Sequence, residues 1–469
     1  MVKQDIKKNN SKLFAYLKGK LFVFLVMFSI IQIFIISKIE FTAWPEMSLW
    51  PYLLLKGWLP YKDFAMVHTP LLIFFLSLFN KIFGSGVLQL KYFTWAFIVF
   101  SNFTLFFVVK KLFNEKKALL ATFIYIPLLM FFQGNGLWFD LALAPLGILI
   151  YFFLTKKKYF WSGIFFFLAI FTKQTAIWFS VPIAFQFLGS HEFSVKKAWP
   201  AIDYFLLGLL IPTLITLLTF WVFKFLPNFS FWAIKFGIFY LPRAEGQIHL
   251  PSLRELLVSF IPFLFLVLYI YVSKKKVNWA LVVWTIFGIL GAYPRWEWFH
   301  YQPALPFVAI VASLVFFKLN KKIEKIMWSL LFIAVIFLSG RYIYRNWGLE
   351  TRFYDKQTQR VVSEVKEQVK TNDSIQVINY WDNIYPLTDT LPSFKPWIPY
   401  LSWYLKYPSV EKRYIYEIAL NKPLLIVEKK FEEFSQNSYE IPEVKIFIDR
   451  FYSPINTIEE KIDILLLNQ

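Results

Sequence analysis

The sequence predicts a polytopic α-helical membrane protein with about eleven transmembrane helices and a small extracytoplasmic α/β domain at its C-terminal end. Composition is the first observation: of 469 residues, 58% are hydrophobic, 22% are aromatic and only 17% are charged, whereas soluble domains carry about 25% charged residues. The second is a series of apolar segments that can cross a bilayer. The third is a division of charge, net +22 in residues 1–343 and net −2 in residues 344–469.

Eleven apolar segments are predicted to span the membrane. They lie near residues 21–39, 92–109, 118–132, 138–155, 159–172, 175–189, 199–224, 253–272, 278–293, 301–318 and 325–343. The basic start of the chain is typical of a signal peptide, but the run Leu21–Ile36 ends without a small-residue cleavage site, so we expect a retained first span. Met47–Leu55 and Leu71–Phe83 are too short to span, and we predict that both are helices at the membrane surface.

The distribution of basic residues predicts the orientation. With the N-terminus inside, the inner segments carry 22 lysines, against 12 basic residues in the rest of residues 1–343. Cytoplasmic loops are the lysine-rich ones, so the long loop 40–91 and the tail face outward. Lys-, Ile- and Phe-rich usage with little Gly indicates a prokaryotic genome, and therefore the cytoplasmic membrane.

The chain divides into two domains on this interpretation, a transmembrane domain (1–343) and a soluble tail (344–469). The tail alternates β-like runs at residues 374–381, 423–429 and 444–450 with polar, helix-compatible stretches such as Thr358–Lys370. Such alternation over about 120 residues predicts a small α/β domain.

Several kinds of site are excluded by residue counts. The chain has no cysteine and four histidines, which rules out disulfides, iron–sulfur clusters and thiolate zinc sites and makes a multi-histidine metal site unexpected. The basic excess lies in short loops between spans, where topology accounts for it, so nucleic acid is not an expected partner.

A few ionisable residues on the predicted outer side need a further explanation. Acids occur in aromatic, proline- or glycine-rich contexts at Glu46, Asp63 and Asp140, and basic residues at or near span ends are Lys173, Arg295 and His300. Ionisable groups in such places are costly and often functional. Three simpler explanations stay open: an interfacial loop anchored by Trp and Tyr, a helix-capping role for Asp140, and snorkelling of the basic side chains to lipid headgroups.

These residues belong to a series of motifs in a fixed order. In chain order the motifs are Glu46, the turn from Gly57 to Asp63, Pro70-Leu71, the run Leu78–Gly84, Asp140, Thr172-Lys173 and the element from Arg295 to Pro303. This order resembles the GT-C glycosyltransferases, in particular the family 39-like group of protein O-mannosyltransferases and aminoarabinose transferases. The resemblance covers roughly residues 20–320.

The resemblance implies a GT-C fold and an inverting transfer on the outer face. A sugar would pass from a polyprenyl-phosphate donor in the membrane to an envelope glycan, lipid or protein. One carboxylate would deprotonate or orient the acceptor, and cations would stabilise the leaving phosphate. In this scheme Glu46 is the base and Asp140 the second acid. The lipid-phosphate contacts are Lys173, Arg295 and Tyr301, with His300 beside them.

The chain departs from the family pattern at two places. Pro45-Glu46 stands where many relatives have Asp-Glu, which leaves open whether Glu46 or Asp63 is the base. His68-Thr69-Pro70 stands where they have Lys-Pro-Pro, which indicates a changed donor or acceptor pocket at His68. No cofactor is expected. Some GT-C branches use a divalent metal, but this group does not, and we expect none.

Two other classes of function remain as alternatives. A flippase, another lipid-linked glycan transporter, or a polymerase would also place polar residues among spans, although carriers usually show paired halves and the sequence shows no such repeat. A membrane scaffold would not explain why the ionisable residues gather on one side. The segment Asp382–Thr388 of the tail could gate the cavity or contact a glycan, or it could be an ordinary loop.

Overall fold

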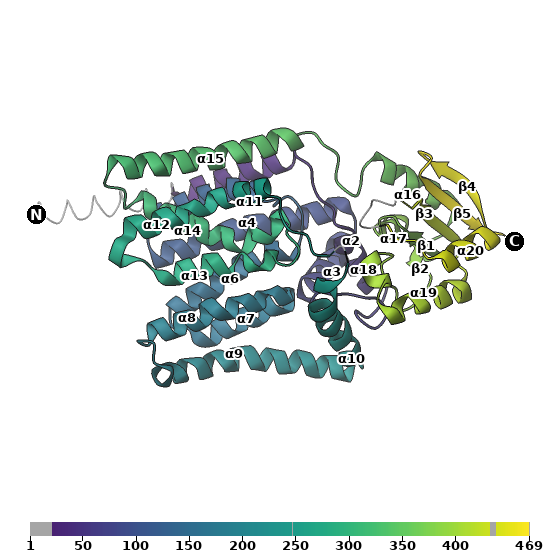
Figure 1. Cartoon of the computed structure of the whole chain (residues 1–469), viewed down its shortest axis with the longest axis horizontal. Coiled ribbons are helices and arrows are strands. Elements are labelled where there is room, and N and C mark those ends of the chain that lie inside the picture. Colours follow the sequence, from purple (N-terminus) through teal and green to yellow (C-terminus); the bar gives the residue numbers. More distant parts are fainter. Residues whose placement is uncertain (1–20, 246, 432–437, 469) are drawn as a thin grey trace, which may run out of the picture.

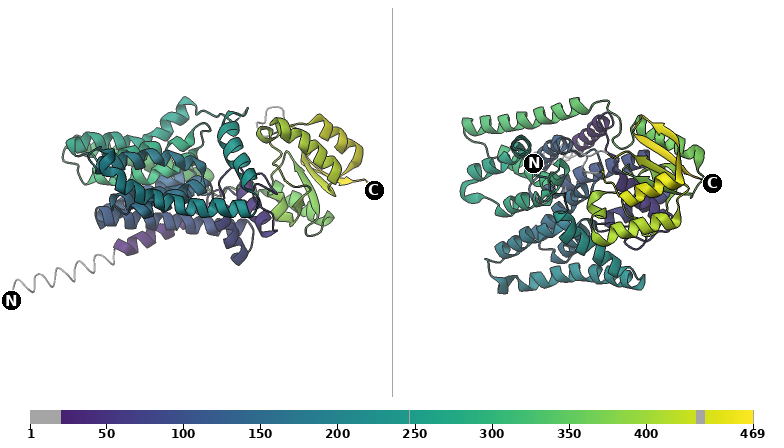
Figure 2. Two further views of the ribbon diagram at one scale, coloured as in Figure 1. Left: turned by 90° about the horizontal axis from the view of Figure 1, so that it is seen from below. Right: turned by 45° about the vertical axis from the view of Figure 1, so that its right-hand side comes forward.

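The structure is a computed structural model that describes residues 21–245, 247–431 and 438–468. Its larger part is a bundle of roughly parallel and antiparallel helices, and its smaller part contains a β-sheet at one end of the bundle (Figures 1 and 2). We call that end of the bundle the tail end. The helices of the bundle are Leu21–Ile36, α4 (Val87–Leu112), α5 (Glu115–Phe131), α6 (Phe139–Thr155), α7 (Tyr159–Thr172), α8 (Ser180–Ser190), α9 (Val195–Val222), α11 (Leu253–Phe260), α12 (Leu264–Ser273), α13 (Trp279–Phe287), α14 (Leu305–Phe316) and α15 (Lys322–Asn346).

These helices confirm a mainly helical membrane protein. Within the described residues, five helical stretches are long and apolar enough to cross a membrane, namely Val87–Leu112, Val195–Val222, Leu253–Ser273, Trp298–Phe316 and Lys322–Asn346. Each of the eleven predicted segments contains a helix. The number that crosses the membrane, the orientation and the domain boundary at residue 343 stay predictions. The basic segment 1–20, part of the topology argument, lies outside the described residues.

Burial along the helices fits a lipid environment. Large apolar side chains stand exposed along α9 and α15, including Leu214, Trp221 and Phe337, and such surface is stable only when something apolar covers it. Inside the bundle α7 and α9 approach closely. A methyl group on Gly163 would lie 2.1 Å from the carbonyl oxygen of Phe205, and one on Gly208 would lie 2.0 Å from that of Phe160. Small residues of this kind permit close helix packing in membranes.

Lysines from different predicted inner segments gather at the end of the bundle away from the tail. The charge of Lys318 interacts with those of Lys117 and Lys276, and its ammonium donates to the hydroxyl of Ser273 at 3.0 Å. Three of the lysine-rich segments therefore lie near one another, as the topology argument requires.

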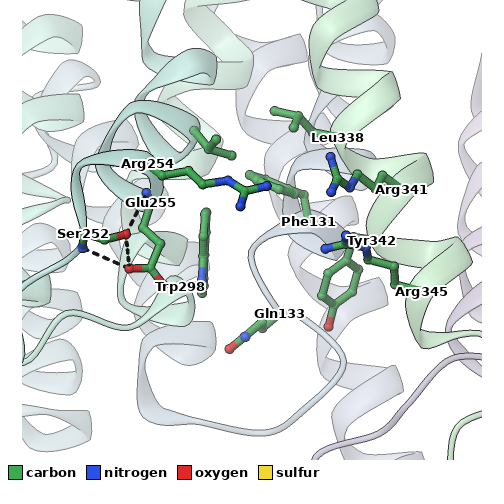
Figure 3. A pocket seen from close by; sticks show the side chains of 11 residues that line it. Phe131, Gln133, Ser252, Arg254, Glu255, Trp298, Leu338, Arg341, Tyr342 and Arg345 are labelled. Carbon is green, nitrogen blue, oxygen red and sulfur yellow. Dashed lines mark hydrogen bonds between the residues drawn. The ribbon is translucent and has the colours of Figure 1, made fainter.

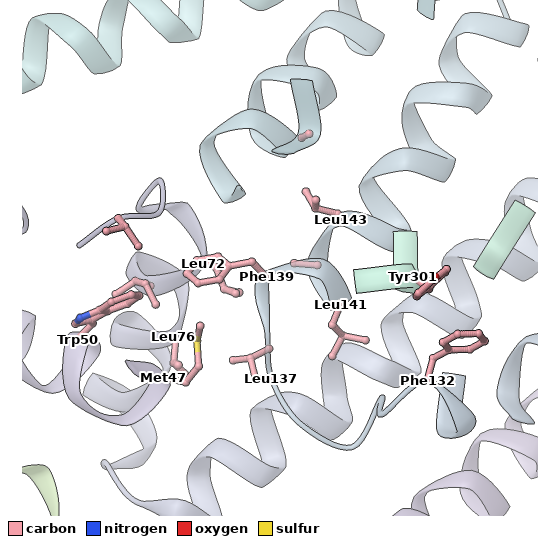
Figure 4. Packing of buried hydrophobic residues seen from close by; sticks show 14 of the residues in the cluster. Met47, Trp50, Leu72, Leu76, Phe132, Leu137, Phe139, Leu141, Leu143 and Tyr301 are labelled. Carbon is pink, nitrogen blue, oxygen red and sulfur yellow. The ribbon is translucent and has the colours of Figure 1, made fainter. Parts of the chain in front are cut away.

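Two short helices close the tail end of the bundle. They are α2 (Pro45–Leu55) and α3 (Leu71–Phe83), at the positions predicted for surface helices. Figure 4 shows Leu137, in the turn before α6, and Phe139, the first residue of α6. Both lie beside Met47, Trp50, Leu72 and Leu76 of these two helices. The apolar faces of α2 and α3 therefore hold the loop that enters α6.

The tail folds around a five-stranded sheet in the order β2-β1-β3-β5-β4. Strand β1 (Ser374–Ile378) pairs in parallel with β2 (Leu391–Pro392) and β3 (Leu425–Lys429), and β5 (Ile462–Leu467) pairs antiparallel with β3 and β4 (Tyr452–Ile458). The accompanying helices are α16 (Lys356–Gln368), α17 (Ile384–Thr388), α18 (Ser402–Leu405), α19 (Pro408–Asn421) and α20 (Pro442–Phe451).

The strands predicted within 374–381 and 423–429 are present, but the strand predicted at 444–450 is wrong. That segment is helix α20, which begins with Pro442 at its first position and carries Glu443 in its first turn. Both are helix-start signals. Val444 and Ile448, four residues apart, are its buried residues, so the apolar period is that of a helix.

The tail is joined to the bundle by several contacts. Backbone hydrogen bonds pair the segment around Phe64 with Trp397, from Ala65 N–H to Trp397 C=O at 2.8 Å and from Trp397 N–H to Asp63 C=O at 2.9 Å. The Tyr52 hydroxyl on α2 donates to the carbonyl of Thr390 at 2.9 Å. The loop 40–91 and the tail therefore form one continuous structure over the end of the bundle.

Candidate functional site

Three of the residues singled out from the sequence form one buried cluster at the tail end of the bundle. The Lys173 ammonium donates to Oδ2 of Asp140 at 2.5 Å, and Nδ1 of His300 lies 2.9 Å from the same oxygen and 3.1 Å from the ammonium. Asp140, Lys173 and His300 are 0%, 3% and 8% exposed. A buried carboxylate must be paired to be stable, and this one is paired twice through one oxygen.

The local sequence explains how the three side chains meet. Asp140 lies in the first turn of α6, Lys173 directly follows α7, and His300 lies in the short helix η7 (Trp298–Ala304). The turn before α6 is fixed by Asn135, whose amide donates to the carbonyls of Ile36 and Glu40 at 2.9 and 2.8 Å. The polar residues that break the apolar segments are thus the ones that the fold brings together.

One oxygen of this cluster has no partner. Oδ1 of Asp140 and the hydroxyl of Thr175 are both buried without a hydrogen bond. Both lie close to Gly291, where an added methyl group would be 3.6 Å from Oδ1 and 3.7 Å from the hydroxyl. The unpaired carboxylate oxygen can accept a hydrogen bond and the hydroxyl can donate one, so the two atoms beside Gly291 can bind a polar molecule such as water.

His68 lies next to the cluster, among aromatic rings. Its ring centroid is 4.4 Å from that of Phe139, 5.8 Å from Trp138 and 6.4 Å from Trp50. Burial and the positive charge of Lys173 lower the pKa of His68 to about 3, so the ring is neutral at physiological pH. His68 can therefore serve as a neutral hydrogen-bonding or packing group.

Glu46 occupies a second position, in the first turn of α2, where it faces the tail. Its Oε2 is buried without a hydrogen-bond partner. Burial raises the pKa of the Glu46 carboxyl, and the charge of Arg295 partly opposes this. The charge of Arg295 also acts on His300, so Arg295 connects the two positions electrostatically. A carboxyl group that keeps a free oxygen and has a raised pKa is suited to act as a general base.

Arg295 is positioned by a short bridge between two loops. The backbone of Trp296 donates to the carbonyl of His249 at 2.7 Å, and the Arg295 guanidinium donates to the side-chain oxygen of Gln247 at 3.1 Å. Arg295 also lies over the ring of Trp403 in the tail, 5.4 Å from its centroid. Nε of Arg295 lies 3.7 Å from a carboxylate oxygen of Glu297. The guanidinium has five N–H donors, so these contacts leave some of them unused.

Two of the sequence candidates are engaged elsewhere. The Asp63 carboxylate accepts from the backbone N–H of Leu59 at 2.8 Å and lies 3.8 Å from the Lys395 ammonium, which is a turn-stabilising arrangement. The Tyr301 hydroxyl accepts from the indole N–H of Trp296 at 3.0 Å, and its ring packs 5.4 Å from that of Phe132. Both residues are thereby fixed in place by the protein itself.

The structure draws attention to Asp382 in the tail, which the sequence analysis named only as the first residue of the segment Asp382–Thr388. Burial and the nearby negative charge of Glu46 raise the pKa of the Asp382 carboxyl well above its usual range. Helix α17, which begins two residues later, packs against α2. The tail thus brings a second acid next to Glu46. Only the docking of the tail reveals this, because 336 residues separate the two acids in the chain.

The raised pKa values predict how stability depends on pH. The folded protein binds more protons at Glu46 and Asp382 than the unfolded chain, so stability falls as pH rises from the ordinary carboxyl range through the raised values. Asp382→Asn removes the larger of these effects. We expect its melting temperature to fall less than that of the wild type between pH 5 and pH 9, with a gain on the order of 1 kcal/mol or more at high pH. Thermal unfolding of the full chain measures this.

A matched control is Glu440→Gln, which removes an exposed carboxylate from the tail segment before α20. Its pH profile should parallel that of the wild type. Parallel profiles for Asp382→Asn and wild type would contradict a carboxyl pair between α2 and the tail.

Metal ligands are not gathered in this region. Within residues 21–245, 247–431 and 438–468, no group of three or more His, Asp or Glu side chains is arranged to hold a metal ion.

Comparisons with known proteins agree with this architecture. Residues 67–217 match the family model of dolichyl-phosphate-mannose-protein mannosyltransferases. A search of curated protein sequences finds no match. Among solved structures, ArnT from Cupriavidus metallidurans aligns in its apo state with a TM-score of 0.64 at 10% identity, over 96% of this chain and 98% of ArnT.

Two further structures give similar alignments. ArnT from the same organism bound to undecaprenyl phosphate has a TM-score of 0.61 at 10% identity, over 94% of this chain and 97% of ArnT. The oligosaccharyltransferase AglB from Archaeoglobus fulgidus, in complex with an inhibitory peptide and a dolichol-phosphate, has a TM-score of 0.58 at 12% identity, over 88% of this chain and 70% of AglB. The chain therefore has the fold of ArnT and AglB, and the match of residues 67–217 to the mannosyltransferase family model supports the family 39-like resemblance inferred from its motifs.

Proposed function

We propose that the protein is a glycosyltransferase that moves a sugar from a polyprenyl-phosphate donor to an acceptor in the cell envelope, on the outer face of the cytoplasmic membrane. The observation that carries this proposal is Glu46, a largely buried carboxyl group with one unpaired oxygen and Arg295 in electrostatic range. The GT-C fold and the lipid phosphate bound by its relative ArnT support the donor class.

The proposed reaction is a single inverting displacement. Glu46 takes the proton of the acceptor hydroxyl as the acceptor oxygen forms its bond to the anomeric carbon. The bond from that carbon to the phosphate oxygen breaks, and the polyprenyl phosphate leaves with the electron pair. Arg295 stabilises the charge that develops on the phosphate, because a fixed guanidinium fork matches phosphate oxygens in a water-poor site.

The buried cluster has a supporting role in this proposal. Lys173 is only 3% exposed and its ammonium forms an ion pair with Asp140. In this proposal Lys173 therefore holds α6, α7 and η7 together and does not contact the donor. His300 is bound to the same carboxylate and lies next to Phe299, whose ring is 5.4 Å from that of Trp44. Trp44 is two residues before Glu46. The cluster thereby fixes one wall of the site.

The test is transfer by purified protein in lipid, with a panel of radiolabelled polyprenyl-phosphate sugars and crude envelope fractions as acceptors. Label in the envelope fraction, with inversion at the anomeric carbon, would support the proposal. Lipid-linked sugar that crosses the bilayer unchanged would instead support a flippase.

We also propose that transfer needs no resident divalent metal, since Arg295 is positioned to supply the positive charge that a metal would otherwise provide. Treatment with EDTA followed by removal of the chelate should leave the initial rate within about twofold of the untreated enzyme. Recovery of lost activity by Mg²⁺ or Mn²⁺ would contradict this and would indicate a metal between Glu46 and Asp382.

A further inference from the structure

A cavity opens at the tail end of the bundle, between α5, α11, η7 and α15. It has a volume of about 540 Å³, and Phe131, Trp298 and Leu338 form apolar parts of its wall. Its polar wall is dominated by arginine. In Figure 3, Arg254 of α11 points across the cavity toward Arg341 of α15, one turn from Arg345 on the same helix.

These three arginines have no carboxylate partner. Among the described residues, Arg295, Arg360 and Arg413 form ion pairs and the three cavity arginines form none. The cavity contains one acid, Glu255, but that carboxylate accepts from the backbone and the hydroxyl of Ser252 at 2.9 and 2.7 Å. The cavity lining thus holds three guanidinium groups against one carboxylate, and a bound anion would offset the remaining positive charge.

The position of the cavity indicates where such an anion would come from. Exposed apolar side chains adjoin the cavity residues in sequence, Phe337 on α15 and Leu257 on α11, and Leu330 lies two turns further along α15. The cavity therefore lies where lipid-facing surface meets the polar tail end. It is also at the opposite end of the bundle from the lysine-rich segments. The positive-inside trend accounts for those lysines, but it does not account for three arginines here.

We infer that this cavity binds the phosphate of a membrane lipid, with the lipid chain lying against α11 and α15. Arginine presents a planar fork of donors that matches phosphate oxygens, and the cavity volume is in the range of ligand sites. The site is separate from Glu46 and does not depend on the proposed transfer reaction. It adjoins the donor side through Trp298, two residues before His300.

The experiment is native mass spectrometry of the delipidated full chain in detergent with three added lipids. They are phosphatidylglycerol, undecaprenyl phosphate and the uncharged dioleoylglycerol. The wild type should bind a phosphate lipid in preference to dioleoylglycerol. Arg341→Gln should weaken that binding about tenfold, and the triple change of Arg254, Arg341 and Arg345 to Gln should weaken it about a hundredfold or more, since hydrogen bonds between charged groups are the strong ones.

The control is a variant in which the exposed tail residues Arg360, Arg413 and Arg450 are changed to Gln. It loses the same charge outside the cavity and should bind the phosphate lipids like the wild type. Loss of phosphatidylglycerol in the cavity variant would identify an ordinary anionic lipid as the ligand. Loss of one bound undecaprenyl phosphate, with phosphatidylglycerol binding unchanged, would identify a polyprenyl-phosphate lipid carrier as the ligand. Wild-type binding of both phosphate lipids by the triple cavity variant, with an unchanged melting temperature, would overturn the inference.

Discussion

Glu46→Gln is expected to lower the rate of sugar transfer by about a hundredfold or more, in line with the loss of a general base. Glutamine has nearly the same shape, so the packing of α2 should be kept, but its amide cannot accept the proton of the acceptor hydroxyl. The measurement is the initial rate at saturating donor and acceptor, with donor binding followed separately. Donor affinity should change little, because Arg295 rather than Glu46 faces the phosphate in the proposed mechanism.

Asp63→Asn is the matched control, and it decides between the two acids that the sequence left open. The Asp63 carboxylate accepts from the backbone N–H of Leu59 and lies 3.8 Å from Lys395. An asparagine oxygen can keep the first of these contacts, and the ion pair that is lost is long and has a half-exposed lysine. Transfer should therefore stay within about threefold of the wild type, since such pairs contribute little energy. A large loss in Asp63→Asn, with Glu46→Gln near wild type, would assign the base to Asp63.

Breaking the buried cluster is expected to have the largest effect on stability. Lys173→Met leaves the Asp140 carboxylate buried with His300 as its remaining partner, and Asp140→Asn leaves the Lys173 ammonium without its counter-charge. Removing one partner of a buried ion pair costs about 3–5 kcal/mol. Each single variant should therefore melt well below the wild type in the same detergent, and should lose transfer activity in proportion to the folded fraction.

The double variant Asp140→Asn, Lys173→Met separates pairing from packing. Because it removes both charges, it should be more stable than either single variant, as expected for coupled residues. The surface pair of Lys197 and Glu192, which is largely exposed, provides the control, and its loss should cost less than about 1 kcal/mol. Additive effects of the two buried substitutions would show that the pair contributes nothing beyond its separate side chains.

Much of the architecture could be predicted because membrane helices are specified by local composition. The surface helix Leu71–Phe83 was predicted with the observed bounds, since its length and its polar Asn80 and Lys81 are properties of the segment alone. The tail was harder. The segment 444–450 alternates in a way that suits a strand, and a run of seven residues does not distinguish a two-residue period from a helical one. Pro442 and Glu443, just before it, were the signal for a helix.

The sequence predicted which residues belong to the candidate site, but not which of them contact one another. Outward charge in apolar surroundings identified Glu46, Asp140, Lys173, Arg295 and His300, because such groups are costly unless they are used or paired. The sequence did not show that Asp140, Lys173 and His300 share one buried contact. It assigned Lys173 to the donor phosphate, whereas we propose a structural role for Lys173 because its ammonium pairs with Asp140.

By itself, then, the sequence determined the membrane class, the helical segments and the identity of the ionisable residues, because each follows from the cost of placing a given side chain in a given solvent. Tertiary structure alone decided which of these residues pair with one another and which keep a free oxygen. It also decided that Asp382 of the tail meets Glu46, and that Arg254 meets Arg341 across a cavity. Such contacts depend on how distant helices pack, and no local pattern in the chain encodes the distance between their side chains.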